Sequence, residues 1–124
     1  MSALYEWKVI LTLTEAEAKA LRACLLFRRA RVEEARKGLD ALPTLLGALD
    51  QLEGPGEKRL RLTWRELSVL SCCVAYCFPN RRRFRVSPEA LEVLDAKLRQ
   101  TSEREAHRFV EAAAREWLEN DREQ

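Results

Sequence analysis

The chain has 124 residues, a formal net charge of +2 and an apolar content of 47%. This length suits one domain with a core of its own, and the apolar content excludes a disordered chain. No uncharged run approaches the roughly 20 residues that cross a bilayer, and the first residues lack the layout of a signal peptide. We therefore expect one globular domain, 1–124, in the cytoplasm, with no membrane partner.

Charge is spread unevenly along the chain. Residues 54–99 hold ten basic and five acidic side chains, a balance of +5, whereas residues 100–124 hold four and seven, a balance of −3. Such asymmetry is typical of a partner surface, and it equally fits an acidic tail helix that packs near a basic segment. The charge pattern leaves both interpretations open.

The first half of the chain predicts a strand and two helices. Residues 5–13 alternate with period two, which indicates a strand with one buried face. Thr14 and Glu17 have the spacing of a capping box and start a helix, which we expect to end at Lys37 because Gly38 can adopt the left-handed stop conformation. A second helix is indicated by leucines at helical spacing that need a partner face, namely Leu39, Leu42, Leu46, Leu49 and Leu52.

Residues 53–57, with two glycines and a proline, predict a linker. Residues 59–62 alternate as a short strand, and Thr63 with Glu66 forms a second capping box. Residues 67–78 carry no charge. A helix that is apolar all round is buried all round, so we expect full burial of this helix up to Pro79, which ends it.

The remaining chain predicts a strand and two more helices. Residues 83–86 alternate as a third short strand. Ser87 caps and Pro88 opens a helix that presents leucines on one face. Ser102 with Glu105 makes a third capping box, which predicts a separate last helix over residues 102–119.

Residues 11–27 align without a gap with residues 60–76. The alignment has six identities in seventeen positions, where composition alone gives roughly one or two. Further on, Pro43 and Leu46 match Pro88 and Leu91. Local rules for a strand that enters a capped helix can also produce similar letters, but the second matched block favours duplication.

Together these elements predict a mostly helical α+β fold, built as a tandem duplicated strand-helix-helix unit with an extra C-terminal helix. Repeat one covers 5–52, the linker 53–57, repeat two 58–100 and the added helix 102–119. We expect pseudo-two-fold antiparallel pairing of the short strands, with helices on one face. Because two strands alone are marginal, the third strand or a second subunit is expected to extend the sheet.

The sequence gives little support for a catalytic site or a metal site. There is no glycine-rich phosphate loop, and His107, the only histidine, lies among charged neighbours. Cys73 and Cys77 are one helical turn apart, but a structural zinc site needs a second ligand pair. We therefore expect no enzyme, no cofactor and no metal, and we expect the cysteines to be reduced core residues.

The strongest polar motif follows the uncharged helix. Residues 81–85 contain four arginines, and Phe78 and Phe84 flank them. Guanidinium groups beside aromatic rings can bind phosphates while a ring stacks on a base, and Arg59 and Arg61 could widen this patch. Arginines just past a helix C-terminus also complement the helix dipole, which is the structural alternative.

Trp64 offers a second candidate, because it replaces the polar Glu15 of the first repeat. An exposed Trp beside Arg65 would be a typical hot spot for a protein partner. Burial against Trp117 of the last helix is the competing interpretation.

We predict a small non-catalytic protein-protein interaction module, such as a phage or mobile-element regulator that docks on a larger host assembly. Nucleic-acid binding through the basic segment is the alternative, and a homodimer formed through strand edges or the leucine stripe is a third reading. The expected binding residues are Arg59, Arg61, Trp64, Arg65, Arg81, Arg82, Arg83, Phe84 and Arg85.

Overall fold

A computed structural model of the chain describes residues 8–35, 42–83 and 86–123. Its elements, in chain order, are β1 (Lys8–Leu13), α1 (Glu15–Ala35), α2 (Leu42–Gln51), β2 (Lys58–Thr63), α3 (Trp64–Cys77), the 3-10 helix η3 (Phe78–Arg83) and α4 (Pro88–Glu123). The described chain is mostly helical with one two-stranded antiparallel sheet, which confirms the predicted α+β class. Among the described helices, none is long and apolar enough to cross a membrane.

Each strand runs directly into a capped helix. The Thr14 amide donates to Glu17 Oε1 at 2.8 Å, and the Glu17 amide donates to Thr14 Oγ1 at 3.2 Å. The Thr63 and Glu66 pair repeats this arrangement at 2.8 and 3.0 Å. Both predicted capping boxes are therefore confirmed, and each satisfies amides that the first turn of a helix leaves free.

The sheet has one buried and one exposed face. Leu11 pairs with Leu60, and the alternation around them points the apolar side chains toward the helices. Ile10, Arg59 and Arg61 lie on the open outer face. This arrangement confirms the predicted antiparallel pairing with helices on one face, since these outer side chains are exposed in the part of the chain that the structure describes.

The strand register is centred on residues that the sequence alignment makes equivalent. Because Leu11 faces Leu60, a local two-fold axis through that pair relates each residue of β1 to its aligned residue of β2. The helices do not follow this relation in length, with 21 residues in α1 against 14 in α3, and 10 in α2 against 36 in α4. The duplication is therefore not confirmed by the fold.

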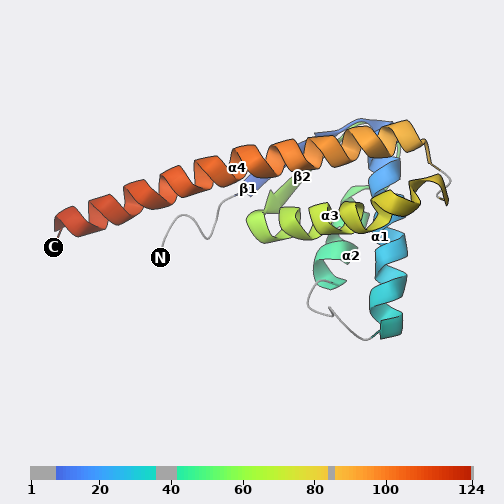
Figure 1. The fold of residues 1–124 in the computed structure, drawn as a ribbon, viewed down its shortest axis with the longest axis horizontal. Helices are drawn as coiled ribbons and strands as arrows, with labels where there is room; N and C mark the ends of the chain where they lie inside the picture. The colour runs from blue at the N-terminus through green and yellow to red at the C-terminus, as the bar shows by residue number, and fades with distance from the viewer. Residues whose placement is uncertain (1–7, 36–41, 84–85, 124) are drawn as a thin grey trace.

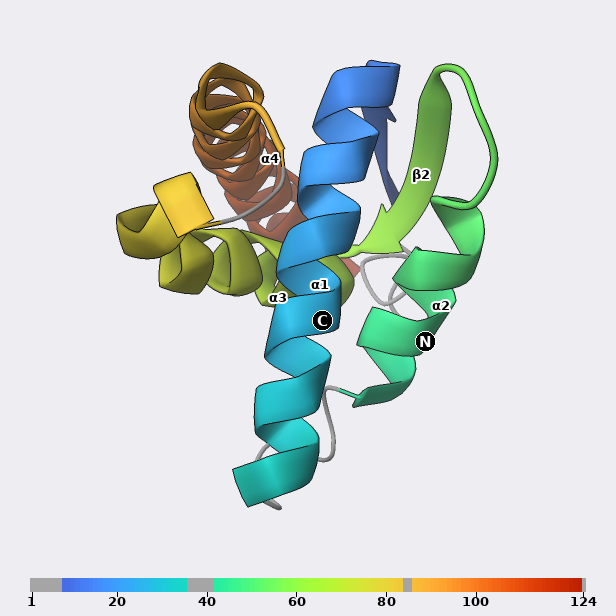
Figure 2. The ribbon, with the colours of Figure 1, turned by 90° about the vertical axis from the view of Figure 1, so that its right-hand side faces the viewer.

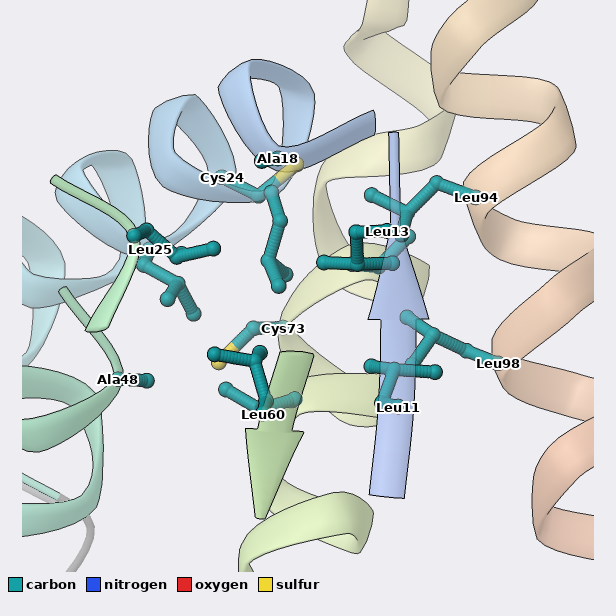
Figure 3. Close-up of a cluster of buried hydrophobic side chains, with 14 of the residues drawn as sticks. Leu11, Leu13, Ala18, Cys24, Leu25, Ala48, Leu60, Cys73, Leu94 and Leu98 are labelled. Atoms are coloured by element: carbon teal, nitrogen blue, oxygen red, sulfur yellow. The ribbon is translucent and has the colours of Figure 1, made fainter. Parts of the chain in front are cut away.

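The core lies between the sheet and the helices and is made mostly of leucine. Figure 3 shows Leu11 and Leu13 of β1 beside Leu94 and Leu98 of α4, with Cys73 of α3 to their left, close to Leu60 of β2. Burying a leucine side chain stabilises a fold by roughly 1.5–3 kcal/mol, so this cluster is the main stabilising feature. The largest fully buried side chains are Leu11, Leu13, Leu21, Leu25, Leu45, Leu60, Leu62, Leu67, Leu70, Leu91, Leu94 and Leu98.

The predicted separate helix over residues 102–119 is wrong, because α4 is one continuous helix of 36 residues. Residues 99–104 contain neither glycine nor proline, so nothing in the chain breaks the helix there. Ser102 does not cap a helix end but lies with its Oγ 3.3 Å from Oγ of Ser71 in α3. Figure 1 shows the result: the first half of α4 packs on the body, and its second half projects past it.

Two smaller expectations also change. Arg83 belongs to η3 and not to a third strand, whose remaining predicted residues lie partly outside the described chain. α3 is not buried all round, since Cys72 and Tyr76 are exposed while Cys73 and Cys77 are buried. Small uncharged side chains tolerate either environment, so the lack of charge did not identify the open side.

The predicted leucine stripe of the second helix is wrong in part. Leu45 is fully buried, whereas Leu46 is 43% exposed. Leu49 and Leu52 are buried as expected, and Leu39 lies outside the described residues, as does the expected helix stop at Gly38. Contact with α1, α3 and β2 selects which side of this helix is buried.

The predicted linker residues 53–57 lie in the turn between α2 and β2. Gly54 and Gly56 have φ angles of +89° and +90°, which side-chain-bearing residues rarely adopt. The Lys58 ammonium group donates to the carbonyl of Glu53 at 2.7 Å and closes the turn.

Candidate functional site

The structure separates the residues that the sequence grouped as one binding surface. Arg59 and Arg61 point outward from β2, while Arg82 and Arg83 lie exposed on η3. In the view of Figure 2, β2 and η3 are on opposite sides of α1. Arg59 and Arg61 therefore do not widen the basic segment of η3.

Trp64 is not an exposed hot spot. Its ring is half-buried and stacks on Phe109 of α4, with ring centroids 6.1 Å apart and an interplanar angle of 15°. Burial beneath the C-terminal part of the chain is thus the correct interpretation, but the expected partner Trp117 is wrong, because that side chain is 68% exposed. Arg65 is exposed beside this contact.

Arg81 has a structural position. Its guanidinium lies 4.5 Å from the ring centroid of Phe78 and donates to the Phe78 carbonyl at 3.2 Å. Its Nε is 3.3 Å from Oε1 of Glu92. Arg81 therefore ties the end of α3 to the start of α4, as the dipole interpretation expected. Phe84 and Arg85 lie outside the described residues.

A different set of residues converges where α1, α3 and η3 meet. α1 and α3 approach closely there, since the Cys77 thiol lies 3.7 Å from the carbonyl of Cys24. Phe27 lies one turn beyond Cys24 on α1, and Tyr76 immediately precedes Cys77 on α3. Their ring centroids are therefore only 6.0 Å apart.

Arginines cover both rings of this aromatic pair. The Cζ atom of Arg28 lies 4.7 Å from the centre of the Tyr76 ring, and that of Arg31 lies 5.0 Å from the centre of the Phe27 ring. Both distances are within the range of cation-π attraction. We call Phe27, Arg28, Arg31, Tyr76, Asn80 and Arg83 the arginine-aromatic cluster.

All residues of the cluster except Arg28 line a surface pocket of about 440 Å³. Arg31, Asn80 and Arg83 provide polar groups around the aromatic walls. A second hollow of about 390 Å³, lined by residues 79–83, adjoins it. An apolar pocket with a few polar groups at its rim is the usual form of a binding site.

The charge of the cluster is predominantly positive. Among the described residues, Arg82 and Arg83 form no ion pair, and the nearby Glu92 is paired with Arg81. When a guanidinium stacks on an aromatic ring, its N–H groups point outward in the plane of the guanidinium. They can therefore donate bidentate hydrogen bonds to an anion. The cluster can therefore bind carboxylate or phosphate groups beside an apolar side chain.

The thiols are mostly inert. Cys24, Cys73 and Cys77 are buried and unoxidised, whereas Cys72 is exposed, contrary to the expectation of four core cysteines. Burial raises the pKa of Cys73 to about 11, and the Cys77 thiol together with burial raises the pKa of Cys24. Within the described chain, no group of three or more potential ligands could hold a metal ion.

His107 lies on the exposed side of α4. Its Nε2 is 3.1 Å from Oε1 of Glu111, one turn further along the same helix. Both side chains are exposed, so the contact is a solvated pair of a helix surface.

Sequence reasoning missed every residue of the cluster except Arg83 as a site residue, although one signal was present. Phe27 and Tyr76 occupy aligned positions, the last of the gapless block, and both are aromatic. An aromatic residue at both aligned positions is therefore the one feature of the sequence that pointed to this pair. Comparison with family models, with curated proteins and with solved structures finds no match to this chain.

Proposed function

We propose that this chain is a small, non-catalytic protein-interaction module that binds an acidic segment of a protein partner through the arginine-aromatic cluster. The observation that carries the proposal is that Phe27 and Tyr76, each stacked by an arginine, line a pocket of about 440 Å³ together with Arg31, Asn80 and Arg83. Arginine and tyrosine are the residue types enriched in interface hot spots. Arginines held on rings also lose less rotamer freedom when they bind.

Two observations favour an acidic protein over a nucleic acid. Binding to single strands uses free ring faces on which bases stack, but guanidinium groups already lie over Phe27 and Tyr76. The chain also carries a net charge of only +2, and Arg81 is committed to Glu92. Nucleic-acid binding typically depends on a strongly basic surface.

The test is a binding titration with a fluorescein-labelled peptide, Glu-Asp-Glu-Trp-Leu-Glu-Asp-Glu, followed by fluorescence anisotropy. We expect Arg83→Glu and Tyr76→Ala each to weaken binding by about tenfold or more, because each removes a hot-spot contact. Arg59→Glu is the matched control, since it makes the same charge change on the outer face of the sheet.

Circular dichroism of each variant checks that the fold is retained. Equal loss in Arg83→Glu and Arg59→Glu would contradict the proposal, because it would show attraction by overall charge alone. A labelled single-stranded oligonucleotide forms the second arm. Tighter binding to it than to the peptide, with a steep salt dependence, would overturn the proposal in favour of nucleic acid.

Two further proposals extend the same interpretation. We propose that the strand-helix units arose by duplication, which the pairing of Leu11 with Leu60 and the aromatic residues at aligned positions 27 and 76 support. A regulatory role in a phage or mobile element, and a cytoplasmic location, stay predictions from size and composition.

A further inference from the structure

The projecting half of α4 carries an exposed apolar stripe. Val110, Ala114, Trp117 and Leu118 follow helical spacing and lie on one face, and the Val110 and Trp117 side chains are 64% and 68% exposed. Monomeric proteins rarely leave such a stripe, with a tryptophan at its centre, open to water without a binding role.

The same segment is acidic. Residues 109–123 contain five acidic and two basic side chains, a balance of −3. Asp121 lies one turn beyond Trp117 on the same face of α4 and is exposed. An exposed aromatic ring beside a carboxylate is the ligand that the arginine-aromatic cluster fits.

One molecule cannot bring these two surfaces together. The Arg81–Glu92 ion pair fixes η3 at the start of α4, and Trp117 lies 25 residues beyond Glu92 on the same helix. At about 1.5 Å per residue, that separation is about 37 Å. Figure 1 shows η3 and the C-terminus at opposite ends of the long axis, so the contact requires two molecules.

We propose that the partner of the arginine-aromatic cluster is a second copy of this chain, whose residues 109–123 dock on the cluster. This inference rests on the proposed function and names its partner. Trp117 of one copy enters the pocket that Phe27 and Tyr76 of the next copy line, while Asp121 pairs with Arg82 or Arg83. The pocket, about 440 Å³, falls in the size range that accommodates such a group.

The contact joins two different surfaces, so it is heterologous. Each added copy still offers one free tail and one free cluster, and assembly continues until a ring closes or the concentration limits it. Because arginine-carboxylate pairs contribute, added salt weakens the assembly.

The experiment measures mass by sedimentation velocity over a concentration series at low and high salt. We expect the wild-type mass to rise with concentration, and Trp117→Ala and Arg83→Glu each to remain monomeric. An equimolar mixture of these two variants is expected to form dimers and nothing larger, because each variant supplies the surface that the other lacks. Val93→Ala, which shortens another exposed side chain of α4, and Arg59→Glu are the matched controls and should associate like wild type.

Monomeric wild type at every concentration overturns the self-docking. If the acidic peptide then still binds in an Arg83-dependent manner, the proposed function stands while this inference fails. A mixture of the two variants that stays monomeric while wild type associates also overturns it, because that result indicates a symmetric interface. Loss of association in either control variant would likewise contradict the assigned surfaces.

Discussion

Glu17 is a buried carboxylate that connects three elements. Its side chain is 5% exposed, and Oε1 lies 2.7 Å from the ammonium group of Lys97 on α4. The same ammonium donates to the carbonyl of Thr12 at the end of β1. Within the described structure, Glu17 Oε2 is buried without a hydrogen-bond partner, so Lys97 and the Thr14 amide provide the compensation for burying this charge.

We predict that Lys97→Met destabilises the protein near neutral pH and that the loss shrinks in acid. Burial opposes ionisation of Glu17, but the hydrogen bonds from Lys97 and Thr14 outweigh it and hold the pKa of this carboxyl below its usual range. A carboxyl with a lowered folded-state pKa stabilises the fold above its unfolded pKa and loses that contribution as the pH falls through the folded value. Removing the Lys97 ammonium group leaves the buried Glu17 carboxylate without this partner. The free energy of unfolding should therefore fall by about 1–3 kcal/mol at neutral pH.

Urea unfolding of wild type and Lys97→Met, at neutral pH and again in acid, measures this difference. Lys19→Met is the matched control, since Lys19 is an exposed lysine of α1 that pairs with the exposed Glu15. If Lys97→Met lowers the free energy of unfolding equally at both pH values, the proposed compensation of the Glu17 charge is contradicted. Such a result would indicate lost packing of the aliphatic part of the lysine side chain.

At the scale of residues, the sequence predicted contacts between residues that are close together in the chain. Thr14 with Glu17 and Thr63 with Glu66 were identified as capping boxes, because a capping box depends only on residues three positions apart. The Glu17–Lys97 pair joins residues 80 positions apart, so neither residue type nor spacing could indicate it. The stacking of Arg28 on Tyr76 likewise needs the α1–α3 contact before it can be seen.

At the scale of elements, α4 shows how a local motif can mislead. Ser102 and Glu105 have capping-box spacing, but inside a continuous helix Ser102 meets Ser71, while Arg104 and Arg108 lie near the Glu105 carboxylate. A cap signature starts a helix only where the preceding backbone leaves helical geometry, and residues 99–101 give no such signal. The absence of a glycine or proline was therefore the more informative feature.

The two halves of α4 should respond differently to the same substitution. Leu98 is 1% exposed and lies beside Leu11 in the core, whereas Leu118 is 50% exposed on the projecting half (Figure 3). We expect Leu98→Ala to cost about 2–5 kcal/mol, because it leaves a cavity. Leu118→Ala should change stability by less than about 0.5 kcal/mol.

Urea unfolding at low protein concentration, where self-association does not contribute, measures both values. Far-UV circular dichroism verifies that α4 stays helical in each variant. A large loss of stability in Leu118→Ala would show that Leu118 packs on the body of the same molecule, and it would remove the basis for a projecting tail.

At the scale of the whole molecule, the sequence predicted the class and the strand pairing but not the helix arrangement. The alternation of apolar and polar residues, together with the helix caps, indicates where strands and helices form. Their apolar faces indicate that they pack against one another. Which helix covers which residues depends on contacts such as those of α1 with α3 and α4, between segments far apart in the chain. This is why Leu45 and not Leu46 is buried, and why Trp64 meets Phe109 and not Trp117.

The buried cluster draws side chains from both strands and from α1, α2, α3 and α4, so we predict that the chain unfolds as one domain in a single transition.

The reactivity of the cysteines can be used to follow this unfolding transition. The exposed Cys72 should react at once with the thiol reagent DTNB, whereas Cys24, Cys73 and Cys77 are buried, and a raised pKa keeps Cys73 protonated. Along a urea series, exposure of these buried thiols should coincide with the loss of far-UV circular dichroism, and Cys72→Ser should abolish only the immediate reaction. Buried thiols that react before helicity is lost would mean that α1 separates from α3 while other helices persist, which contradicts a single cooperative core.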